Sequence, residues 1–322
     1  MSNTTSLCKT ARRSKLACSI GAALLLTVSG ASQALNILLT NDDGWNSPGI
    51  TATRTALIAA GHTVTLVGPL NNQSGKGGSM IADNGVTVAV VQSGGPGSNV
   101  WSVDSTPSDS VRAAFGNAAG GVLPAGTKPD LVISGINNGQ NLGMTGTWGS
   151  GTVNAALVAL AYGVPSIAVS AERLLTPSDA DTVNAMPAIA NFTVRLVDRL
   201  QQTALGGQLL PAGTMLNVNY PVFNAAAGRP GSLQGVKVTN LATHSNIEFA
   251  WSGTPATTGT MTAGVDFGFY FSPVADPIAN NDKAALKSGF VSVTPMDGDM
   301  TAKSKPGTNF SSLQWRLNGL TP

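Results

Sequence analysis

An apolar run at residues 35–40, which ends abruptly in Asn41-Asp42-Asp43-Gly44, constrains the fold of this chain more than any other segment. An uninterrupted apolar run of this length is typical of a strand that is buried on both faces of a parallel sheet. The Ala-rich residues 50–60 then predict a helix that ends at Gly61, and residues 63–69 predict a second strand. Because strand–helix–strand crossovers are right-handed, we expect the two strands to be parallel neighbours in one sheet.

The same alternation of strand and helix patterns continues to residue 234. We expect strands at residues 131–135, 166–170 and 215–219, a hairpin from residues 86–91 and 99–103, a long Gly/Asn loop at residues 136–149, and helices at residues 107–119, 150–162 and 187–205. From residue 235 we expect strands at residues 236–239, 247–251, 265–271 and 290–294, with a short helical stretch near residues 282–286. The sequence therefore predicts an α/β fold. A doubly wound, Rossmann-like and mostly parallel sheet spans residues 35–234, and a β-rich C-terminal extension spans residues 235–322.

The first 34 residues have the pattern of an export signal. A basic start from Lys9 to Lys15 precedes an apolar run at residues 16–28, and the small residues Ser32 and Ala34 predict cleavage after Ala34. The alternative is an anchoring transmembrane helix, but the apolar run is shorter than the roughly 20 residues that cross a bilayer. We therefore expect an exported protein, periplasmic or secreted, without a stable membrane anchor. The choice between the Sec and twin-arginine routes stays open.

The formal charge of +2, from 18 Lys and Arg against 16 Asp and Glu, changes sign when the predicted signal is removed. The signal holds four of the basic residues and no acid, so 14 basic and 16 acidic residues remain and the charge becomes −2. Such a chain is a poor binder of nucleic-acid polymers, because affinity for the phosphate backbone comes from many Lys and Arg side chains. Both cysteines, Cys8 and Cys18, leave with the signal, which excludes thiol catalysis and disulfides in the mature protein.

Polar residues follow the predicted strands at their carboxyl ends, where an open α/β sheet binds ligands. Asp42 and Asp43 are adjacent, and adjacent carboxylates repel each other unless a cation compensates their charge. Hard divalent cations prefer oxygen ligands, and a Ser hydroxyl and an Asn amide from neighbouring loops could complete such a site. The alternative is a solvated turn without a ligand. The two histidines, His62 and His244, are too few for a histidine-based zinc site.

Ser150-Gly151-Thr152 opens a predicted helix after a glycine-rich loop. N–H groups at a helix N-terminus bind anions, and Gly lets a phosphate approach closely, so this segment is a candidate phosphate site. Ordinary N-capping of the helix by Ser150 is the more frequent reason for such a sequence. Both interpretations stay open at this point.

Short motifs, spread over most of the predicted mature chain, occur together in an order that matches a known family. They are NILLTNDDGWNSPGI at residues 36–50, NQSG at 72–75, STPSD at 105–109, PDLVISGINNGQN at 129–141, SGTV at 150–153, LNVNYP at 216–221 and GFVSVTP at 289–295. In these motifs the chain resembles the SurE family, the survival-protein nucleotidases and acid phosphatases. Members of that family remove phosphate from nucleoside 5′- and 3′-monophosphates.

The resemblance implies a site, a cofactor and partners. It implies a divalent cation, Mg²⁺ or Mn²⁺, and a nucleotide or another phosphate ester as substrate. It also implies a homodimer or tetramer in which C-terminal strands are exchanged between subunits. The implied cation ligands are Asp42, Asp43, Ser74 and Asn137, and the implied phosphate pocket consists of Asn41, Gly135, Asn141, Ser150, Gly151 and Thr152.

The sequence departs from the family pattern at three places on the rim of the expected site. Residues 144–149 contain no carboxylate, where the family has one or two acidic residues followed by a Tyr. Val158 stands where a Glu is common, and Leu70-Asn71 replaces an Asp-Arg pair. The implied metal ligands are all present, so the departures bear on substrate choice, rate and subunit contacts more than on the type of reaction.

The hypothesis that follows is metal-assisted hydrolysis of a phosphate monoester, with a nucleoside monophosphate as the first choice of substrate. A water attacks phosphorus in line with the leaving alkoxide, and either Asp42 or Asp43 takes its proton. Two alternatives are a broad-specificity acid phosphatase or exopolyphosphatase, and a degenerate member that binds phosphate or nucleotide without turnover. Trp45, Trp101 or Trp148 could stack on a base, although packing is the more frequent role of an aromatic residue in such a loop.

Overall fold

The computed structural model of the chain describes residues 33–81, 85–174, 179–244, 247–253, 259–265 and 276–299. The predicted export signal, apart from Gln33 and Ala34, lies outside these residues. So does the strand predicted at residues 265–271, apart from its first residue.

The strands and helices of the described residues alternate along most of the chain. The strands are β1 (Asn36–Thr40), β2 (Thr63–Pro69), β3 (Val90–Gln92), β4 (Val100–Val103), β5 (Leu131–Asn138), β6 (Ser166–Ala171), β7 (Thr214–Tyr220), β8 (Gly235–Val238), β9 (Ile247–Gly253), β10 (Gly259–Val265) and β11 (Phe290–Asp297). The helices are α1 (Pro48–Ala59), α2 (Pro107–Phe115), α3 (Gly143–Gly149), α4 (Gly151–Ala161), α5 (Ala180–Gln202) and α6 (Asp282–Lys287), with one 3₁₀ turn at Ala225–Ala227.

Nine of the strands form one sheet in the order β3-β4-β2-β1-β5-β6-β7-β11-β8. The strands from β4 to β7 in this order are parallel, whereas β3 runs antiparallel to β4 and β11 runs antiparallel to β7. The strand order reverses between β1 and β5, because the chain leaves β1 for β2 on one side and returns through α2 to β5 on the other. The predicted α/β class with a mostly parallel, Rossmann-like sheet is confirmed.

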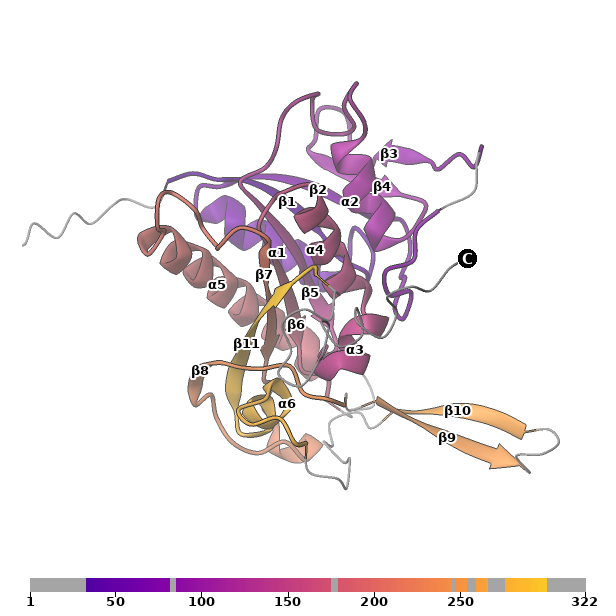
Figure 1. Cartoon of the computed structure of the whole chain (residues 1–322), viewed down its shortest axis with the longest axis vertical. Coiled ribbons are helices and arrows are strands. Elements are labelled where there is room, and N and C mark those ends of the chain that lie inside the picture. Colours follow the sequence, from indigo (N-terminus) through magenta and orange to yellow (C-terminus); the bar gives the residue numbers. More distant parts are fainter. Residues whose placement is uncertain are drawn as a thin grey trace, which may run out of the picture. The chain divides into compact units, whose positions relative to one another are not determined.

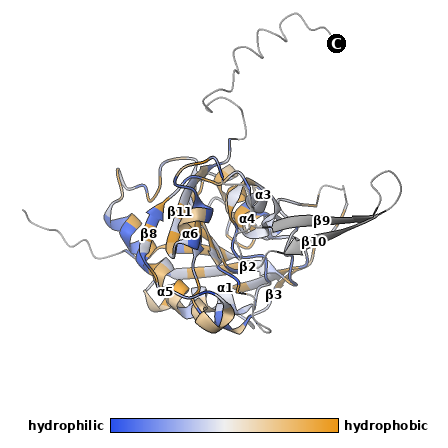
Figure 2. Cartoon of the chain, turned by 90° about the horizontal axis from the view of Figure 1, so that it is seen from below, coloured by the Kyte–Doolittle hydropathy of each residue, from blue (hydrophilic) through white to orange (hydrophobic). Residues whose placement is uncertain are grey.

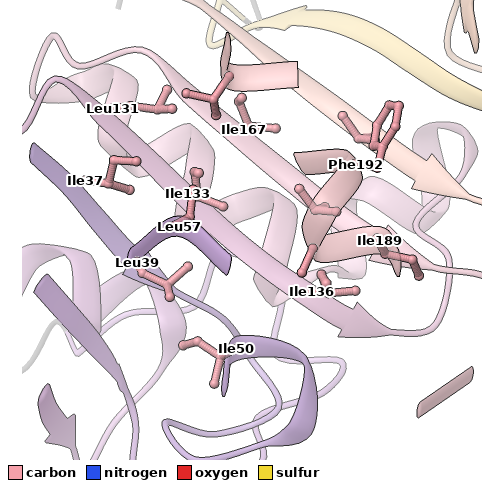
Figure 3. Close-up of a cluster of buried hydrophobic side chains, with 14 of the residues drawn as sticks. Ile37, Leu39, Ile50, Leu57, Leu131, Ile133, Ile136, Ile167, Ile189 and Phe192 are labelled. Atoms are coloured by element: carbon pink, nitrogen blue, oxygen red, sulfur yellow. The ribbon is translucent and has the colours of Figure 1, made fainter. Parts of the chain in front are cut away.

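Helices cover both faces of this sheet (Figures 1 and 2). Helices α1 and α5 lie side by side on one face, and α2 and α4 lie together on the other. The main hydrophobic core lies between the sheet and the α1/α5 pair. Figure 3 shows how aliphatic and aromatic side chains from the strands and both helices meet there, among them Ile37, Leu57, Ile133, Ile189 and Phe192.

The face of the sheet that α2 and α4 cover is apolar at one end and polar at the other. Near the amino ends of the strands, Leu38 and Val132 pack into a second core cluster with residues of α2 and α4. Because side chains alternate along a strand, the residues two places further on belong to the same face. Near the carboxyl ends this face carries fully buried polar side chains, namely Thr40, Ser134, Ser170, Asn217 and Asn219. Burial of polar groups is costly unless they are hydrogen-bonded, which marks this end of the sheet as the place to look for a site.

The prediction of a loop over residues 136–149 is wrong at both ends, because only the residues between β5 and α3 form a loop. Strand β5 continues to Asn138, with a shift of register between Ser134 and Asn137, and helix α3 occupies the second half. Helix α3 is rich in Gly and Thr, so its intrinsic helix propensity is low. Contacts from distant parts of the chain hold it instead. For example, the N–H of Met144 donates to the carbonyl of Ala242 at 2.8 Å.

Two helices differ from their predicted bounds. Helix α2 ends at Phe115 rather than at residue 119, because the chain turns at Gly116, where φ is 63°. Helix α5 begins at Ala180 rather than at residue 187, and Pro187 lies inside it. Proline favours the first turn of a helix, where no backbone hydrogen bond is lost, so the sequence pattern placed the start too late.

The predicted hairpin and the C-terminal strands contribute to two sheets. The hairpin is present as β3 and β4, although β3 covers only residues 90–92 of a strand predicted at residues 86–91, and β4 also pairs with β2. Strands β8 and β11 pair with each other, and β11 pairs with β7, so both extend the main sheet. Among the described residues, β9 and β10 pair with each other alone, as an antiparallel two-stranded sheet. The predicted β-rich C-terminal portion is therefore present, and α6 corresponds to the short helix expected near residues 282–286.

Candidate active site

The strand order reverses between β1 and β5, and Asp42 and Asp43 follow directly after β1. The sheet register pairs Thr40 with Ser134, which places the two aspartates beside the last residues of β5. Asp42 is only 3% exposed, whereas Asp43 is partly exposed. Two adjacent carboxylates of different accessibility therefore lie at the switch point of the sheet, where ligands of such folds bind.

The N-terminus of α4 holds the carboxylate of Asp42. The hydroxyl of Thr152 donates to Oδ1 of Asp42 at 2.5 Å, and backbone hydrogen bonds from Gly151 and Thr152 also favour its charged form. Burial is the larger effect, and it raises the pKa of Asp42 above its ordinary value. The close approach requires glycine at position 151, because a Cβ atom there would lie 2.7 Å from Cβ of Asp42.

Ser150 is the N-cap of α4. Its hydroxyl accepts the N–H of Val153 at 3.1 Å, as ordinary capping predicts. The capping interpretation of Ser150 is confirmed. Direct contact of Ser150, Gly151 or Thr152 with a phosphate stays a prediction.

Asp43 is tied to the end of β5. Its Oδ2 atom accepts the backbone N–H of Asn138 at 2.8 Å, and its Oδ1 atom lies 3.5 Å from Nδ2 of Asn72. Burial, and after it the negative charge of Asp42, raises the pKa of Asp43 to about 6. A carboxylate with this pKa can exchange a proton close to neutral pH, which suits a group that accepts a proton from water.

The other two implied metal ligands come from the loop after β2 and from β5. The Ser74 loop is joined to the first aspartate, because the N–H of Gln73 donates to the carbonyl of Asp42 at 2.7 Å. Asn137 is 8% exposed, and its Nδ2 atom donates to the carbonyl of Gly139 at 2.6 Å, so its amide oxygen is the atom that remains for a ligand. The structure therefore brings the immediate neighbours of Ser74 and Asn137 into contact with the two aspartates.

The chemistry of these donors fits a hard divalent cation. Two adjacent carboxylates both have raised pKa values, and a cation would offset both the cost of their burial and their repulsion. The nearby serine and asparagine supply oxygen, the ligand atom that Mg²⁺ and Mn²⁺ prefer. In the part of the chain that the structure describes, no group of three His, Cys, Asp or Glu side chains offers a different metal site.

Two residues of the implied phosphate pocket are engaged within the fold. Asn41 is fully buried, and its Nδ2 atom donates to the carbonyl of Gly44 at 2.9 Å and to Oγ of Ser47 at 2.8 Å. It thereby shapes the turn that carries the aspartates. Gly135 has a φ of 130°, and a Cβ atom there would lie 2.2 Å from the carbonyl oxygen of Val169 in the neighbouring strand. Both residues shape the backbone around the two aspartates, and their contact with phosphate stays a prediction.

Asn141, also expected in the pocket, is anchored by polar residues that the sequence pattern did not mark as functional. Asn219 binds both backbone groups of Asn141, since its Oδ1 accepts the N–H at 2.7 Å and its Nδ2 donates to the carbonyl at 3.2 Å. Asn217 donates to the same carbonyl at 2.9 Å, and Oγ of Ser170 accepts from Nδ2 of Asn141 at 2.9 Å. The signal available in the sequence is the spacing of Asn217 and Asn219, which puts two amides on one face of a strand end.

Asp282, the first residue of α6, anchors the segment that follows Asn141. Its Oδ2 atom accepts the N–H of Gly143, and its Oδ1 atom accepts the N–H of Ala242, both at 2.9 Å. The carboxylate is fully buried, and burial raises its pKa. One side chain thus joins the start of α3 to the C-terminal part of the chain. The partners Gly143 and Asp282 are 139 residues apart, so no local pattern predicts their contact.

A charged pair lies beyond the end of β6. The Nε and Nη2 atoms of Arg173 lie 2.8 Å from Oδ1 and Oδ2 of Asp179, respectively. Oδ2 of Asp179 in turn lies 3.5 Å from Nδ2 of Asn138, the residue whose backbone N–H binds Asp43. The positive charge of Arg173 lowers the pKa of Asp43 and the charge of Asp179 raises it, although burial dominates. The pair is therefore part of the electrostatic environment of the site.

Of the three tryptophans considered for base stacking, Trp148 at the end of α3 is 60% exposed. Trp45 and Trp101 are partly buried and pack against the two core clusters. The packing interpretation therefore holds for Trp45 and Trp101, and Trp148 remains a candidate for contact with a substrate.

Comparisons with known proteins agree with this geometry. A family model described as "Survival protein SurE" matches residues 37–248. A 5′-nucleotidase SurE of Geotalea daltonii is 33% identical over 275 residues, which cover 83% of this chain and 94% of the relative. A 5′-nucleotidase SurE of Rubrobacter xylanophilus is 36% identical over 273 residues, which cover 83% of this chain and 93% of the relative. The crystal structure of the SurE protein from Aquifex aeolicus matches with a TM-score of 0.63 and 29% identity, covering 87% of this chain and 99% of that chain.

Proposed function

This chain belongs to the SurE family, and from that premise we propose that it hydrolyses phosphate monoesters with the help of a divalent cation and acts on nucleoside monophosphates. The observation that carries the proposal is the pair of adjacent aspartates at the switch point, with the pKa of Asp43 raised to about 6. The relatives described above are 5′-nucleotidases, and all the implied site residues lie inside the matched range 37–248.

The cation, Mg²⁺ or Mn²⁺, would be held by Asp42, Asp43, Ser74 and Asn137. When bound, it would polarise the phosphoryl oxygens and lower the pKa of the attacking water. The chain's own residues orient these ligands. Thr152 fixes the carboxylate of Asp42, and the N–H of Asn138 fixes that of Asp43.

Asp43 is the better candidate to accept the proton of the attacking water. It is more exposed than Asp42, and its Oδ1 atom has only a long contact of 3.5 Å, with Nδ2 of Asn72. The Oδ1 atom of Asp42 is already engaged by Thr152, which favours a fixed ligand over a group that exchanges protons. The leaving alkoxide then departs from the side of phosphorus opposite to the water.

The phosphate would lie between the aspartates and the loops that carry Asn41, Gly135, Asn141 and Ser150-Gly151-Thr152. The N-terminus of α4 carries the positive end of the helix dipole, so it favours negative charge beside Asp42. The amide clamp formed by Asn217 and Asn219 keeps the backbone of Asn141 in place.

Asp43→Asn is the first test of the reaction. We expect the variant to keep its fold and to lose most of the Mn²⁺-dependent release of phosphate from AMP. Asp297→Asn is the matched control. This exposed aspartate ends β11 and pairs with Thr214 at the start of β7, so it lies near the amino ends of the parallel strands, whereas Asp43 lies at their carboxyl ends. Turnover of AMP by Asp43→Asn at the wild-type rate would refute the proposal.

A second candidate, a broad-specificity acid phosphatase or exopolyphosphatase, is favoured by the lack of any carboxylate in α3. A panel of AMP, 3′-AMP, glycerol phosphate and polyphosphate separates the candidates. Preference for the two nucleotides supports the nucleotidase, and similar rates on all four support the broad phosphatase. Binding of AMP without release of phosphate would identify a degenerate member.

We further propose that the protein is exported and that cleavage follows Ala34. The basic start, the apolar run at residues 16–28 and the absence of cysteine after residue 34 support this. No helix of the described residues is both long enough and apolar enough to cross a membrane. Sequencing the N-terminus of protein from the periplasm and the culture medium tests the proposal. We expect Leu35 as the first residue, and an intact Met1 would contradict it.

The protein would form a homodimer or tetramer through its C-terminal strands. The supporting observation is that β9 and β10 form their own two-stranded sheet, separate from the main one among the described residues. Replacing residues 247–265 by a short Gly-Ser linker should convert the oligomer to a monomer in light scattering. An unchanged molar mass would refute this assignment.

A further inference from the structure

The pair formed by Arg173 and Asp179 has no role in the function proposed so far. Its geometry is good, with two parallel contacts of 2.8 Å between the guanidinium and the carboxylate. Both side chains are partly open to solvent, at 38% and 35% exposure. A pair this exposed contributes little to stability, so structural support does not explain its presence beside the site.

The backbone around Arg173 is fixed to the segment that follows β5, the strand that contains Asn137. Its N–H donates to Oε1 of Gln140 at 2.9 Å, and the N–H of Gly139 donates to the carbonyl of Ala171 at 3.1 Å. On the other side, Asn138 links Asp179 to Asp43, with contacts of 3.5 Å and 2.8 Å. Asp179 and Asn138 therefore link the guanidinium of Arg173 to the carboxylate of Asp43.

The carboxylate of Asp179 can remain charged without Arg173. Asp179 precedes the first residue of α5, but its backbone (φ 25°, ψ 9°) lacks the extended conformation in which an N-cap side chain reaches the N–H groups of the first turn. Among the described residues its side chain makes no capping hydrogen bond, and both oxygens bind Arg173 instead. If the guanidinium leaves, the carboxylate remains partly exposed to solvent, and it lies beside a helix N-terminus whose dipole favours negative charge. The exchange of partners therefore leaves neither charge isolated.

The charge balance of the site favours such an exchange. Asp42, Asp43 and Asp179 carry three negative charges when ionised, against the single positive charge of Arg173. A divalent cation would bring this set close to neutrality, and a dianionic phosphate monoester would make it negative again. Arg173 is linked to Asp43 through the contacts of Asp179 and Asn138, so it is a cationic side chain placed to compensate the phosphate.

We propose that Arg173 is a substrate-binding residue whose guanidinium exchanges Asp179 for the phosphate group of the substrate, while the released carboxylate of Asp179 is solvated at the start of α5. The inference rests on the proposed phosphatase function and deepens it. In this arrangement Asp179 competes with the substrate for Arg173. The two residues of one ion pair thus have opposite effects on phosphate affinity.

Calorimetric titration with inorganic phosphate in the presence of Mn²⁺ tests this opposition directly. Arg173→Met should weaken phosphate binding by about 10- to 100-fold, the value of a hydrogen-bonded charge, and should raise KM for AMP in parallel. Arg173→Lys should lie between Arg173→Met and the wild type, because it keeps the charge and loses the planar fork. Asp179→Asn should strengthen phosphate binding, because it removes the competitor. Arg199→Met, which removes an exposed arginine near the far end of α5, is the control and should bind phosphate as the wild type does.

A merely structural pair would give a different result. If the pair only held the chain together, Arg173→Met and Asp179→Asn would weaken binding alike, and this outcome would overturn the proposal. Unchanged phosphate affinity in Arg173→Met would overturn it as well. If the wild type binds phosphate through Arg173 but releases none from any ester, the proposed function fails and the inference stands. If the wild type turns over AMP and Arg173→Met binds and reacts equally well, the inference fails and the function stands.

Discussion

The hydroxyl of Thr152 donates a 2.5 Å hydrogen bond to Oδ1 of Asp42 across 110 residues of sequence. This contact ties the first turn of α4 to the end of β1. It also fixes which oxygen of Asp42 remains for a cation. The position of a buried carboxylate is thus set by a neutral hydroxyl rather than by a counter-charge.

Thr152→Val removes this hydroxyl without changing the shape of the side chain. A hydrogen bond to a buried charge contributes about 1.5–3 kcal/mol, so we expect kcat/KM for AMP to fall by about 10- to 100-fold and the affinity for Mn²⁺ to fall with it. Thr152→Ser keeps the hydroxyl and should retain most of the activity. Equal activity of the valine and serine variants would show that this hydrogen bond does not contribute to kcat/KM.

Gly151→Ala should disturb the same contact by steric means. The added Cβ would lie 2.7 Å from Cβ of Asp42 and 2.9 Å from Cγ of Pro107, so one of them must move. We expect a loss of about 1–3 kcal/mol in the free energy of unfolding, together with loss of activity. Gly149→Ala is the control, because a Cβ there would meet none of the described atoms within 4 Å. Urea denaturation of both variants measures the difference, and equal losses would contradict the packing argument.

The raised pKa of Asp43 predicts how stability depends on pH without a cation. Its folded pKa of about 6 lies above the ordinary value of 3.8, so between these values the folded state binds more protons than the unfolded state. The free energy of unfolding should therefore fall as pH rises from 4 to 6. Asp43→Asn should flatten this dependence in urea titrations with a chelator present. A slope as steep in Asp43→Asn as in the wild type would contradict the assignment.

Mn²⁺ should reverse this trend. The cation competes with protons for both aspartates, so its binding strengthens as pH rises through about 6. The increase in Tm that 1 mM Mn²⁺ produces should therefore be larger at pH 7 than at pH 5. An increase that is the same at both values would mean that the cation does not bind the aspartates.

Asp282→Ala should loosen the site from a distance. It leaves the buried N–H groups of Gly143 and Ala242 without their acceptor, at a cost of about 2–4 kcal/mol. Amide hydrogen exchange at Gly143 and Met144 should accelerate more than exchange in β1 or β2. Asp282→Asn keeps one acceptor oxygen, so it should lose less stability than Asp282→Ala. Uniform acceleration over the whole sheet would indicate global destabilisation rather than a local anchor.

The parts of this protein that could be predicted from the sequence are those with local causes. Residues 63–69 form a strand because their apolar side chains alternate with Thr between a helix end and a proline, and the structure places β2 at these residues. Ser150 could be identified as a cap because capping needs only the three residues that follow it. The adjacency of Asp42 and Asp43 needed no folding at all.

What could not be predicted depends on the path of the chain. Helix α3 has a poor helical sequence and exists because Ala242 and Asp282 bind its first turn. The hydrogen bonds between Asn219 and Asn141 join residues 78 apart. Their prediction would have required the order of β5, β6 and β7 in the sheet. The pairing of Arg173 with Asp179 likewise depends on where α5 begins, which the position of Pro187 obscured.

The order of strands in the sheet also has a consequence for biosynthesis. Strand β8 lies at the edge of the sheet, and its described neighbour is β11, which the ribosome makes about fifty residues later. At roughly 5–20 residues per second, the ribosome completes β11 several seconds after β8. Asp282, which locks the loop before α3, emerges in the same late segment. The edge strand β8 and the loop before α3 therefore cannot reach their final contacts until the segment that carries Asp282 and β11 has been made.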